Sequence, residues 1–503
     1  MAFETKNLKV FKKFVLPKNQ IEKECVTELE ESIDKVLSVS CSVAPLVVDV
    51  VDGEISYSAT ISTCVIFATS QMSIGTANST CEFTGKIQNG DIASSDKAIL
   101  SLSVKDHSVS VENDKVIVGV TIEESAEVFA ERDVVTVESS DDDVCTKNSE
   151  TSIKRLVCTT KKECSTEDEF VARGNVKKII FLEPIVSVKG IESQNGFVAV
   201  SGETLTKIMY LTTEDKFETN YVSCPFKEEI EMENCDANSI VECQAIPVFK
   251  DCVSEVLESD KGTKISVKTA FVLNAFACGE EEVSLLEDLF STTSEIQMTS
   301  ESFEMSKLCR SEMIDSKIDG SLSLGEEKPR VDKILFCSGG EILVTNSYVS
   351  NGDLFVEGIA KTTVVYLNDD EGTLNSVEIE IPFAINDKTT ASEEASVCVD
   401  GVIYDCDVVA KKGRELFFDG KVKINARLCE KEISATIVGA QRGEVFAERD
   451  YTMQYIYGKA GESLWEIAKR NKVSESQLVA QNADAIFPLI QDTGFVLFYQ
   501  KTL

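Results

Sequence analysis

A seven-residue segment that occurs twice constrains this chain more than any other feature. The segment Glu-Val-Phe-Ala-Glu-Arg-Asp stands at Glu127–Asp133 and again at Glu444–Asp450, 317 residues later. An identical match of this length within one chain is very improbable by chance, and self-similarity at a long period is typical of tandem repeats. If one more copy lies between the two, each unit is about half of that distance long, which is the size of an ordinary domain.

Shorter landmarks locate the middle copy. Gly202–Leu211 resembles Gly358–Leu367, since each segment begins at a glycine and ends in Tyr-Leu, and the two lie 156 residues apart. Pro225-Phe226 likewise matches Pro382-Phe383 at an offset of 157 residues. These pairs indicate that a second and a third copy follow one register.

The first copy follows the same register. Ala59, Phe67 and Cys81–Phe83 each stand 143 residues before their counterparts in the second copy. Three landmarks at one constant offset argue against slippage of the alignment. Because the offsets of 143 and 156 together fall 18 residues short of 317, we expect the later copies to carry insertions before the heptapeptide.

Each copy has the pattern of β-strands. An Asx-Gly pair, which is a strong hairpin turn signal, stands at Asp52-Gly53, Asn195-Gly196 and Asn351-Gly352. β-Branched and aromatic residues follow it, and the Pro-Phe step then begins the next strand, where a missing N–H is tolerated. The sequence therefore predicts a mainly β chain of three tandem, sandwich-like repeat domains.

Two short helices are expected between the strands, at Gln20–Glu31 and at Glu281–Phe290. The repeat alignment argues that the second of these is partly strand. Ser139–Asp143 is acidic and Gly320–Gly325 is rich in glycine and serine, so both are interpreted as linkers or loops.

The pattern changes after Asp450. Ser463 with Glu466, and Ser474 with Gln477, have the spacing of two capping boxes, so a helix is expected to begin after each serine. An aromatic, strand-like segment precedes these helices and another follows them. The predicted order of strand, helix, helix and strand spans Tyr451–Tyr457, Ser463–Arg470, Ser474–Asn482 and Phe495–Tyr499.

The charge and the residue counts exclude several classes of function. The net charge of −36 repels nucleic acid and anionic lipid, although simple solubility also explains it. Histidine occurs once, at His107, so a catalytic triad or a multi-histidine metal site would depend on one strand-like residue. No cofactor and no catalytic residue is predicted. An enzyme with an unrecognised carboxylate site remains a distant alternative among the 86 acidic residues.

The N-terminus and the short apolar stretches predict a cytosolic protein, and this prediction decides how the cysteines are interpreted. No basic, apolar export signal and no stretch long enough to span a bilayer is visible. The 17 cysteines are therefore expected to be reduced and mostly buried, and the absence of any Cys-x-x-Cys pair argues against zinc. Cross-linking after a later exposure to oxidant stays open.

The C-terminal segment resembles a LysM domain. The resemblance lies in Gly461–Lys469, in Val473–Leu478 and at Asn482, and it covers roughly residues 452–503. Glu462 replaces the usual Asp of the first loop, and Pro488–Gly494 replaces a short Pro-Gly turn. In the family these loops border the glycan groove, so the departures weaken the case for carbohydrate binding.

The repeats together with this tail resemble the SPOCS repeats and the domain order of SipL-like spore-coat morphogenetic proteins. The tract Asp288–Ile296 and the strands that lead into Pro-Phe carry the likeness. The resemblance implies a non-enzymatic scaffold in the mother-cell cytoplasm, at the forespore surface, that supports encasement and binds the coat morphogenetic ATPase through its LysM domain. The predicted domains are SPOCS-like repeats at 1–150, 151–308 and 309–451, and a LysM-like domain at 452–503.

Two LysM loops are the candidate partner-binding surface. The alternative is that Gly461 and Ser463 only shape and cap the helix, and Trp465 is interpreted as core. A peptidoglycan- or glycan-binding wall protein with β-repeat spacers is the rival function, and self-association or other coat proteins as partners stay open through exposed sheet edges. The candidate residues are Gly461, Glu462, Ser463, Leu464, Asn482, Ala483, Asp484, Ala485 and Ile486.

Overall fold

The structure, a computed structural model, is almost entirely β. It describes residues 3–29, 32–70, 73–112, 115–138, 141–259, 262–368, 372–447 and 449–499. Within these ranges two short α-helices occur, both near the C-terminus, and no helix has the length and apolar character that a membrane crossing requires. The predicted mainly β fold is confirmed.

Three β units follow one another along the chain. The first holds β1 (Glu4–Val15), β2 (Asn19–Glu28), β3 (Ile33–Val51), β4 (Glu54–Thr69), β5 (Ile74–Gln88), β6 (Lys97–Glu112) and β7 (Lys115–Glu138). The second holds β8 (Val144–Val171), β9 (Val176–Gln194), β10 (Phe197–Thr212), β11 (Phe217–Glu231), β12 (Ile240–Pro247), β13 (Val253–Ser259) and β14 (Gly262–Ser291), with a 3-10 turn η1 (Phe249–Asp251). The third holds β15 (Ser294–Ser323), β16 (Val331–Ser350), β17 (Asp353–Asn368), β18 (Leu374–Lys388), β19 (Ser396–Lys411) and β20 (Glu415–Val445).

Each unit contains the same antiparallel three-stranded meander. The strands are β3-β4-β5, β9-β10-β11 and β16-β17-β18, and the middle strand has 16 residues in every case. The turn before the middle strand has a left-handed glycine each time, at Gly53, Gly196 and Gly352. The hairpins predicted from the Asx-Gly pairs are therefore confirmed.

Close packing explains why a glycine landmark accompanies Pro-Phe. A Cβ on Gly202 would stand 2.2 Å from the carbonyl oxygen of Ser187 and 2.5 Å from the ring of Phe226. Gly358 is confined in the same way by Phe383. The absent side chain thus makes room for the phenylalanine of the neighbouring strand.

A second sheet covers the meander in the first two units. The sheet β1-β7-β2, with β6 beside β7, faces β3-β4-β5, and Ile61 and Val65 of β4 pack in one core with Val118 and Val120 of β7. In the second unit β12, β13 and β8 pair with β14 and form the corresponding sheet. Both units are therefore sandwiches of two sheets around an apolar core.

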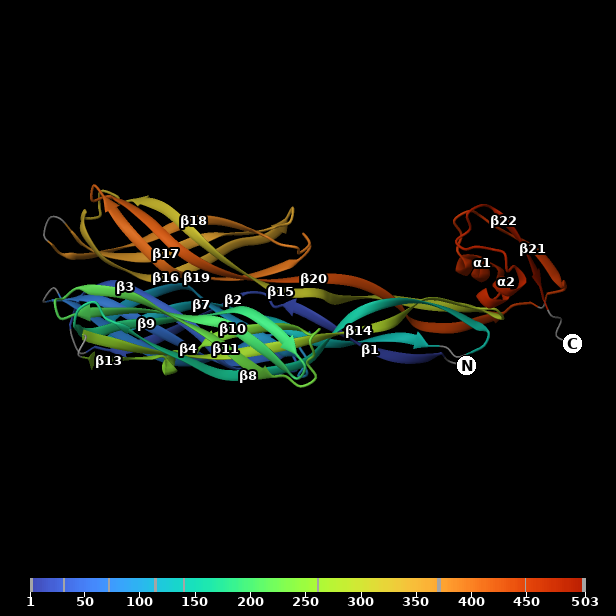
Figure 1. The fold of residues 1–503 in the computed structure, drawn as a ribbon, viewed down its shortest axis with the longest axis horizontal. Helices are drawn as coiled ribbons and strands as arrows, with labels where there is room; N and C mark the ends of the chain where they lie inside the picture. Colours follow the sequence, from blue (N-terminus) through green and yellow to red (C-terminus); the bar gives the residue numbers. More distant parts are fainter. Residues whose placement is uncertain are drawn as a thin grey trace.

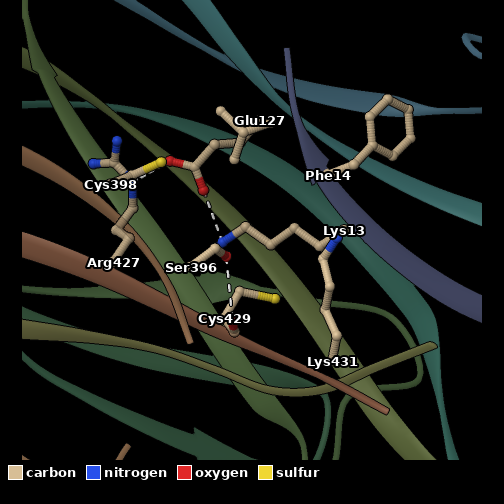
Figure 2. A pocket seen from close by; sticks show the side chains of 9 residues that line it. Lys13, Phe14, Glu127, Ser396, Cys398, Arg427, Cys429 and Lys431 are labelled. Atoms are coloured by element: carbon tan, nitrogen blue, oxygen red, sulfur yellow. Dashed lines mark hydrogen bonds and ion pairs between the residues drawn. The ribbon is translucent and has the colours of Figure 1, made fainter. Parts of the chain in front are cut away.

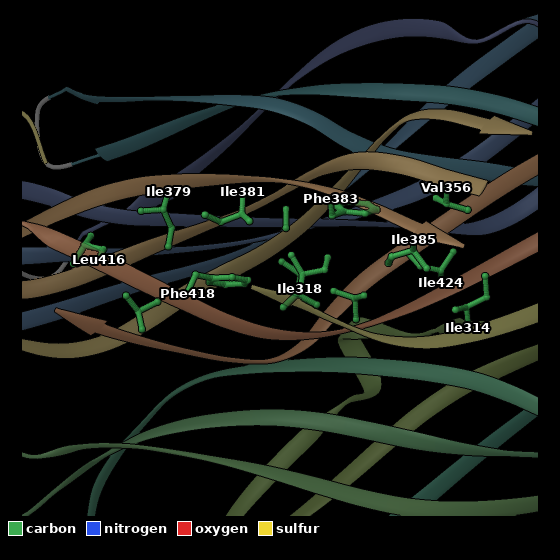
Figure 3. Packing of buried hydrophobic residues seen from close by; sticks show 14 of the residues in the cluster. Ile314, Ile318, Val356, Ile379, Ile381, Phe383, Ile385, Leu416, Phe418 and Ile424 are labelled. Carbon is green, nitrogen blue, oxygen red and sulfur yellow. The ribbon is translucent and has the colours of Figure 1, made fainter. Parts of the chain in front are cut away.

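The third unit is one six-stranded sheet, in the order β15-β20-β19-β16-β17-β18. It folds over itself, because Ile314 and Ile318 of β15 share a core with Ile381 and Phe383 of β18, as Figure 3 shows. Among the described residues, one ladder pair joins β16 to β19, and we call this junction the seam.

Three paired ribbons leave the sandwiches together and form what we call the stalk (Figure 1). The ribbons are 4–15 with 127–138, 144–156 with 278–291, and 294–306 with 431–445. Apolar side chains from all three meet in successive layers along it. These include Phe129 stacked on Phe276 with ring centroids 4.5 Å apart, then Val283 beside Val10, then Ile437 beside Val137.

Where the stalk meets the sandwiches, buried charges join all three units. Lys13 of β1 lies 2.8 Å from carboxylate oxygens of both Glu127 and Glu242, and Arg427 of β20 binds Glu127 and, at 2.6 Å, Asp400. Figure 2 shows Glu127 between Arg427 and Lys13, beside a cavity of about 210 Å³. Burial alone would raise the pKa of Glu127, but the two cations outweigh it and lower that pKa.

Replacing Arg427 by methionine should destabilise the chain strongly. Glu127 would stay buried with one cation in place of two, and breaking a buried pair in this way costs about 3–5 kcal/mol. Lys6→Met is the matched control on the β1–β7 ribbon that carries Glu127, because Lys6 pairs with Glu138 while more than half of both side chains is exposed, so it should cost below about 1 kcal/mol. Urea denaturation compares the two, and equal losses would contradict the importance of this ion cluster.

The seam places one carboxyl group where it resists ionisation. Glu341, which pairs with Val402, has its pKa raised to about 7, first by burial and then by the nearby carboxylate of Glu378, against the attraction of Lys361. Glu183 and Asp106 add further negative charge around it. The folded state therefore favours the protonated acid, whereas the unfolded chain ionises near its ordinary value.

The protonated carboxyl group of Glu341 therefore contributes to the free energy of unfolding below the pKa that Glu341 has in the unfolded chain. This contribution is lost as the pH rises through about 7, the pKa of Glu341 in the folded state. The urea midpoint of the wild type should fall between about pH 5 and about pH 8 relative to that of Glu341→Gln, which cannot ionise. Glu415→Gln removes an exposed carboxylate of β20 and should keep the wild-type difference. Parallel midpoints for wild type and Glu341→Gln would show the assignment to be wrong.

Both predicted helices in the repeats are wrong. Gln20–Glu31 forms β2 as far as Glu28, and its last two residues lie outside the described residues. Glu281–Phe290 belongs to β14, where the neighbouring residues Leu285 and Leu286 are both buried because they pack in two different apolar clusters of the stalk. Burial on both faces of the strand removes the two-residue alternation, so that the apolar spacing imitates a helix.

The expected linkers also differ from the structure. Gly320–Ser323 is the end of β15 and not a loop, because it pairs with Glu415–Phe418 in the ladder. Asp141–Asp143 does form a turn, while Ser139 and Ser140 lie outside the described residues.

The two heptapeptides occupy different places. Glu127 lies within β7 and contacts Arg427, 300 residues away, whereas Glu444 lies at the end of β20, where the chain leaves the stalk. The additional residues that the repeat offsets predict before the second heptapeptide are part of β20 itself and not an inserted loop, since β20 pairs with β15 up to Val445. The repeat is therefore real in the meanders, but the identical segments are not structural equivalents.

One cysteine pair departs from the expectation of reduced thiols. Cys25 of β2 and Cys81 of β5 form a disulfide with a Cα–Cα distance of 6.1 Å. The two residues are 56 positions apart, and only the packing of the facing sheets brings them together. The predicted domain boundaries at 150/151 and 308/309 fall inside β8 and β15, and the division into domains stays a prediction.

Candidate interaction site on the C-terminal module

The last described segment is a small, separate module at the far end of the stalk (Figure 1). It consists of β21 (Met453–Gly458), α1 (Leu464–Asn471), α2 (Glu475–Gln481) and β22 (Thr493–Phe498), so the predicted order is confirmed. Ser463 caps α1 in a full capping box with Glu466. At α2 half of the expected box is present: Gln477 N–H donates to Ser474 Oγ at 3.1 Å, but the Gln477 side chain donates to Phe498 O.

The first candidate loop is held by internal bonds. Gly461 has a left-handed backbone and donates to Leu489 O at 2.7 Å, while Leu489 N–H donates to Glu462 O at 3.0 Å. The Glu462 carboxylate accepts from Arg470, which lowers its pKa, and from the backbone N–H of Lys459 at 2.7 Å. Glu462 therefore fastens its own module, a role that the sequence did not indicate.

The second candidate loop is fastened to β22. The Asn482 amide donates to Leu478 O and Val496 O, both at 3.1 Å, and accepts from Val496 N–H at 3.2 Å. Ala485 packs against the core of the module, as Leu464 of the first loop does. The exposed candidates in this loop are Ala483, Asp484 and Ile486.

Comparison with protein families assigns two parts of the chain. The model of the SPOCS domain of SipL matches residues 330–411, which span β16 to β19, and the LysM model matches residues 459–488. The chain carries a SipL-type SPOCS domain and a LysM domain. Both are non-catalytic families. No curated protein and no solved structure matches the chain.

The LysM domain is anchored to the stalk through its one tryptophan. Trp465 is buried and packs on Phe290 of β14, with ring centroids 5.0 Å apart. Its indole N–H donates to Asp288 Oδ2 at 2.8 Å, and Lys469 Nζ lies 2.6 and 2.7 Å from the two oxygens of the same carboxylate. The interpretation of Trp465 as core is confirmed, and the second unit supplies part of that core.

A group of four exposed, mostly aromatic side chains of the LysM domain lies outside both candidate loops. Alternate residues of β21 point away from the helices, together with the end of β22, and Tyr455 covers Gly494 of the facing strand. We call this surface the aromatic face: Met453, Tyr455, Tyr457 and Phe498, each more than half exposed. The sequence contains a signal for this face, because Met453, Tyr455 and Tyr457 alternate with Gln454 and Ile456 and must lie on one side of a strand. Contiguous exposed apolar side chains mark interaction sites.

Across the described ranges, no group of three or more His, Cys, Asp or Glu side chains is placed to hold a metal ion.

Removing the Asp288 carboxylate should loosen the LysM domain. Asp288→Ala leaves the buried indole N–H without an acceptor, which costs about 1–3 kcal/mol. Because Trp465 is the one tryptophan in the chain, its emission should shift to longer wavelength at lower urea than in the wild type. Glu287→Ala, one residue earlier and paired at the surface with Lys147, is the control, and an equal shift in both variants would refute the anchor.

Proposed function

We propose that this chain is a non-enzymatic spore-coat morphogenetic scaffold that docks through its LysM domain onto the coat morphogenetic ATPase. It would act in the mother-cell cytoplasm, at the forespore surface, and support encasement of the forespore. A SipL-type SPOCS domain in combination with a C-terminal LysM domain supports this function.

The aromatic face is the observation that carries the proposal. Four large side chains, two of them tyrosines, are exposed together on a module of about fifty residues. Tyrosine is enriched among the residues that dominate protein–protein binding energy. Two polar side chains of the loops are, by contrast, already bound within the module: Glu462 binds Arg470, and the Asn482 amide binds Leu478 and Val496. A protein partner therefore fits this LysM domain better than a sugar with many hydroxyl groups.

The body of the molecule suits a scaffold. The buried contacts of Lys13, Glu127 and Arg427 fasten the three units to one another, and Asp288 fastens the LysM domain to the stalk. The LysM domain is thereby held at one end of the molecule, away from the sandwiches (Figure 1). No described residue covers its aromatic face, whose four side chains are each more than half exposed.

Binding of peptidoglycan is the alternative function. LysM domains as a family suggest glycan binding, and Ile486 and Ile490 are strongly exposed beside the loops that border the family's groove. This alternative places the binding residues on the loops and not on the aromatic face, so variants of the two surfaces distinguish the functions.

The test uses the full chain against the immobilised coat morphogenetic ATPase and, in parallel, in sedimentation with insoluble peptidoglycan. Tyr455→Ser should weaken capture by the ATPase about tenfold or more, because a central aromatic contact is typically worth at least 1–2 kcal/mol. Ile486→Ser and Val409→Ser, the latter at an exposed valine of β19, should leave that capture unchanged. Trp465 emission checks that each variant keeps its LysM domain folded and docked.

Two outcomes would count against the proposal. Sedimentation of the wild type with peptidoglycan, lost in Ile486→Ser and retained in Tyr455→Ser, would establish the glycan-binding alternative. Unchanged capture of Tyr455→Ser by the ATPase would remove the aromatic face from the docking surface.

A further inference from the structure

Two cysteines face each other across the seam of the third unit. The pair that joins β16 to β19 is Glu341 with Val402, in an antiparallel arrangement. Counting four residues along each strand from this pair brings Cys337 opposite Cys406, because each strand has one irregularity on the way, in β16 between Ser338 and Glu341 and in β19 between Ile403 and Asp405. The register does continue past the bonded pair, since a Cβ on Gly340 would stand 3.3 Å from the Cβ of Ile403, its opposite residue.

Contacts at the two thiols agree with this register. Both side chains pack on the core of the third unit, and hydrogen bonding from Cys337 is the largest influence on the pKa of Cys406. The bond from Cys337, with help from the nearby ammonium of Lys207, lowers the pKa of Cys406 although burial opposes this. Both cysteines are only partly buried.

The surroundings belong to two units. Lys207 comes from β10 of the second unit, and Tyr221 of β11 lies beside the backbone of Cys406. The cation favours the thiolate, which is the form of cysteine that reacts. In contrast, burial raises the pKa of Cys41, Cys64 and Cys398, which marks these thiols as unreactive.

We propose that Cys337 and Cys406 are an oxidation site that closes the seam with a disulfide when the protein meets a two-electron oxidant such as hydrogen peroxide. The Cys406 thiolate attacks one peroxide oxygen, the O–O bond breaks, and one water leaves after protonation. The Cys337 sulfur then attacks the sulfenic sulfur of Cys406, the S–S bond forms, and a second water leaves. Two thiols and one peroxide thus give one disulfide and two waters.

The first unit has a disulfide at a place where the third unit has none. Its disulfide joins Cys25 to Cys81, whose equivalents in the third unit are Gly320 and Ile381, in contact with each other. The third unit therefore lacks a covalent link at that place, while one ladder pair holds its seam. A Cys337–Cys406 bond would tie β16 to β19 beside the contact with the second unit.

Peptide mapping of the full chain after peroxide treatment and alkylation is the direct test. Trypsin should release residues 334–361 linked to residues 389–411, and a further cut after Tyr404 should assign the link to Cys406 and not to Cys398. The melting temperature should rise on oxidation and return with dithiothreitol. This measurement needs no variant, so it does not depend on the folding of a mutant.

Three variants complete the design. Cys337→Ser and Cys406→Ser should each abolish the link and the change in melting temperature, while Cys398→Ser, a thiol on the same strand as Cys406, should retain both. Separate alkylation of Cys337 and Cys406 after oxidation of the folded chain would overturn the proposal. A link from Cys406 to any other cysteine, or between two chains, would overturn it as well.

Discussion

The contacts of Lys13 and Arg427 with Glu127 are the constraint on which the architecture depends. They lie where each unit sends one long strand, β7, β14 or β20, out of a sheet and into the stalk, and Glu242 extends them to the second unit. Buried charges tolerate few alternative arrangements, because any shift leaves one of them unpaired. The ion cluster therefore fixes how the three units face each other, and the apolar layers of the stalk continue that arrangement toward the LysM domain.

Much of the fold could be predicted from the spacing of a few landmarks. Phe67, Tyr210 and Tyr366 stand at constant offsets and are buried at equivalent points of β4, β10 and β17. The prediction failed where the strands leave the sandwiches. In β14 both faces are buried in the stalk, at Leu285 and at Leu286, and a strand without apolar–polar alternation cannot be told from a helix by its periodicity.

The LysM domain illustrates the same limit at the candidate site. Its elements and caps were predictable, because capping depends on residues three positions apart. Its anchor was not, because the indole of Trp465 meets Asp288, 177 positions earlier in the chain. Glu462 and Asn482 lie in the candidate loops, but their side chains bind their own module, and the four exposed side chains of the aromatic face belong to β21 and β22.

The stalk also determines how the molecule carries mechanical load. A pull on the LysM domain reaches the body through the end of β20 at Val445, along the length of a strand paired to β15 by bonds that run across the direction of pull. Such bonds are loaded in shear and must break together, whereas a hairpin pulled open at its end loses them one at a time. A layer assembled from these molecules would thus resist tension at each docking point without any change in binding affinity.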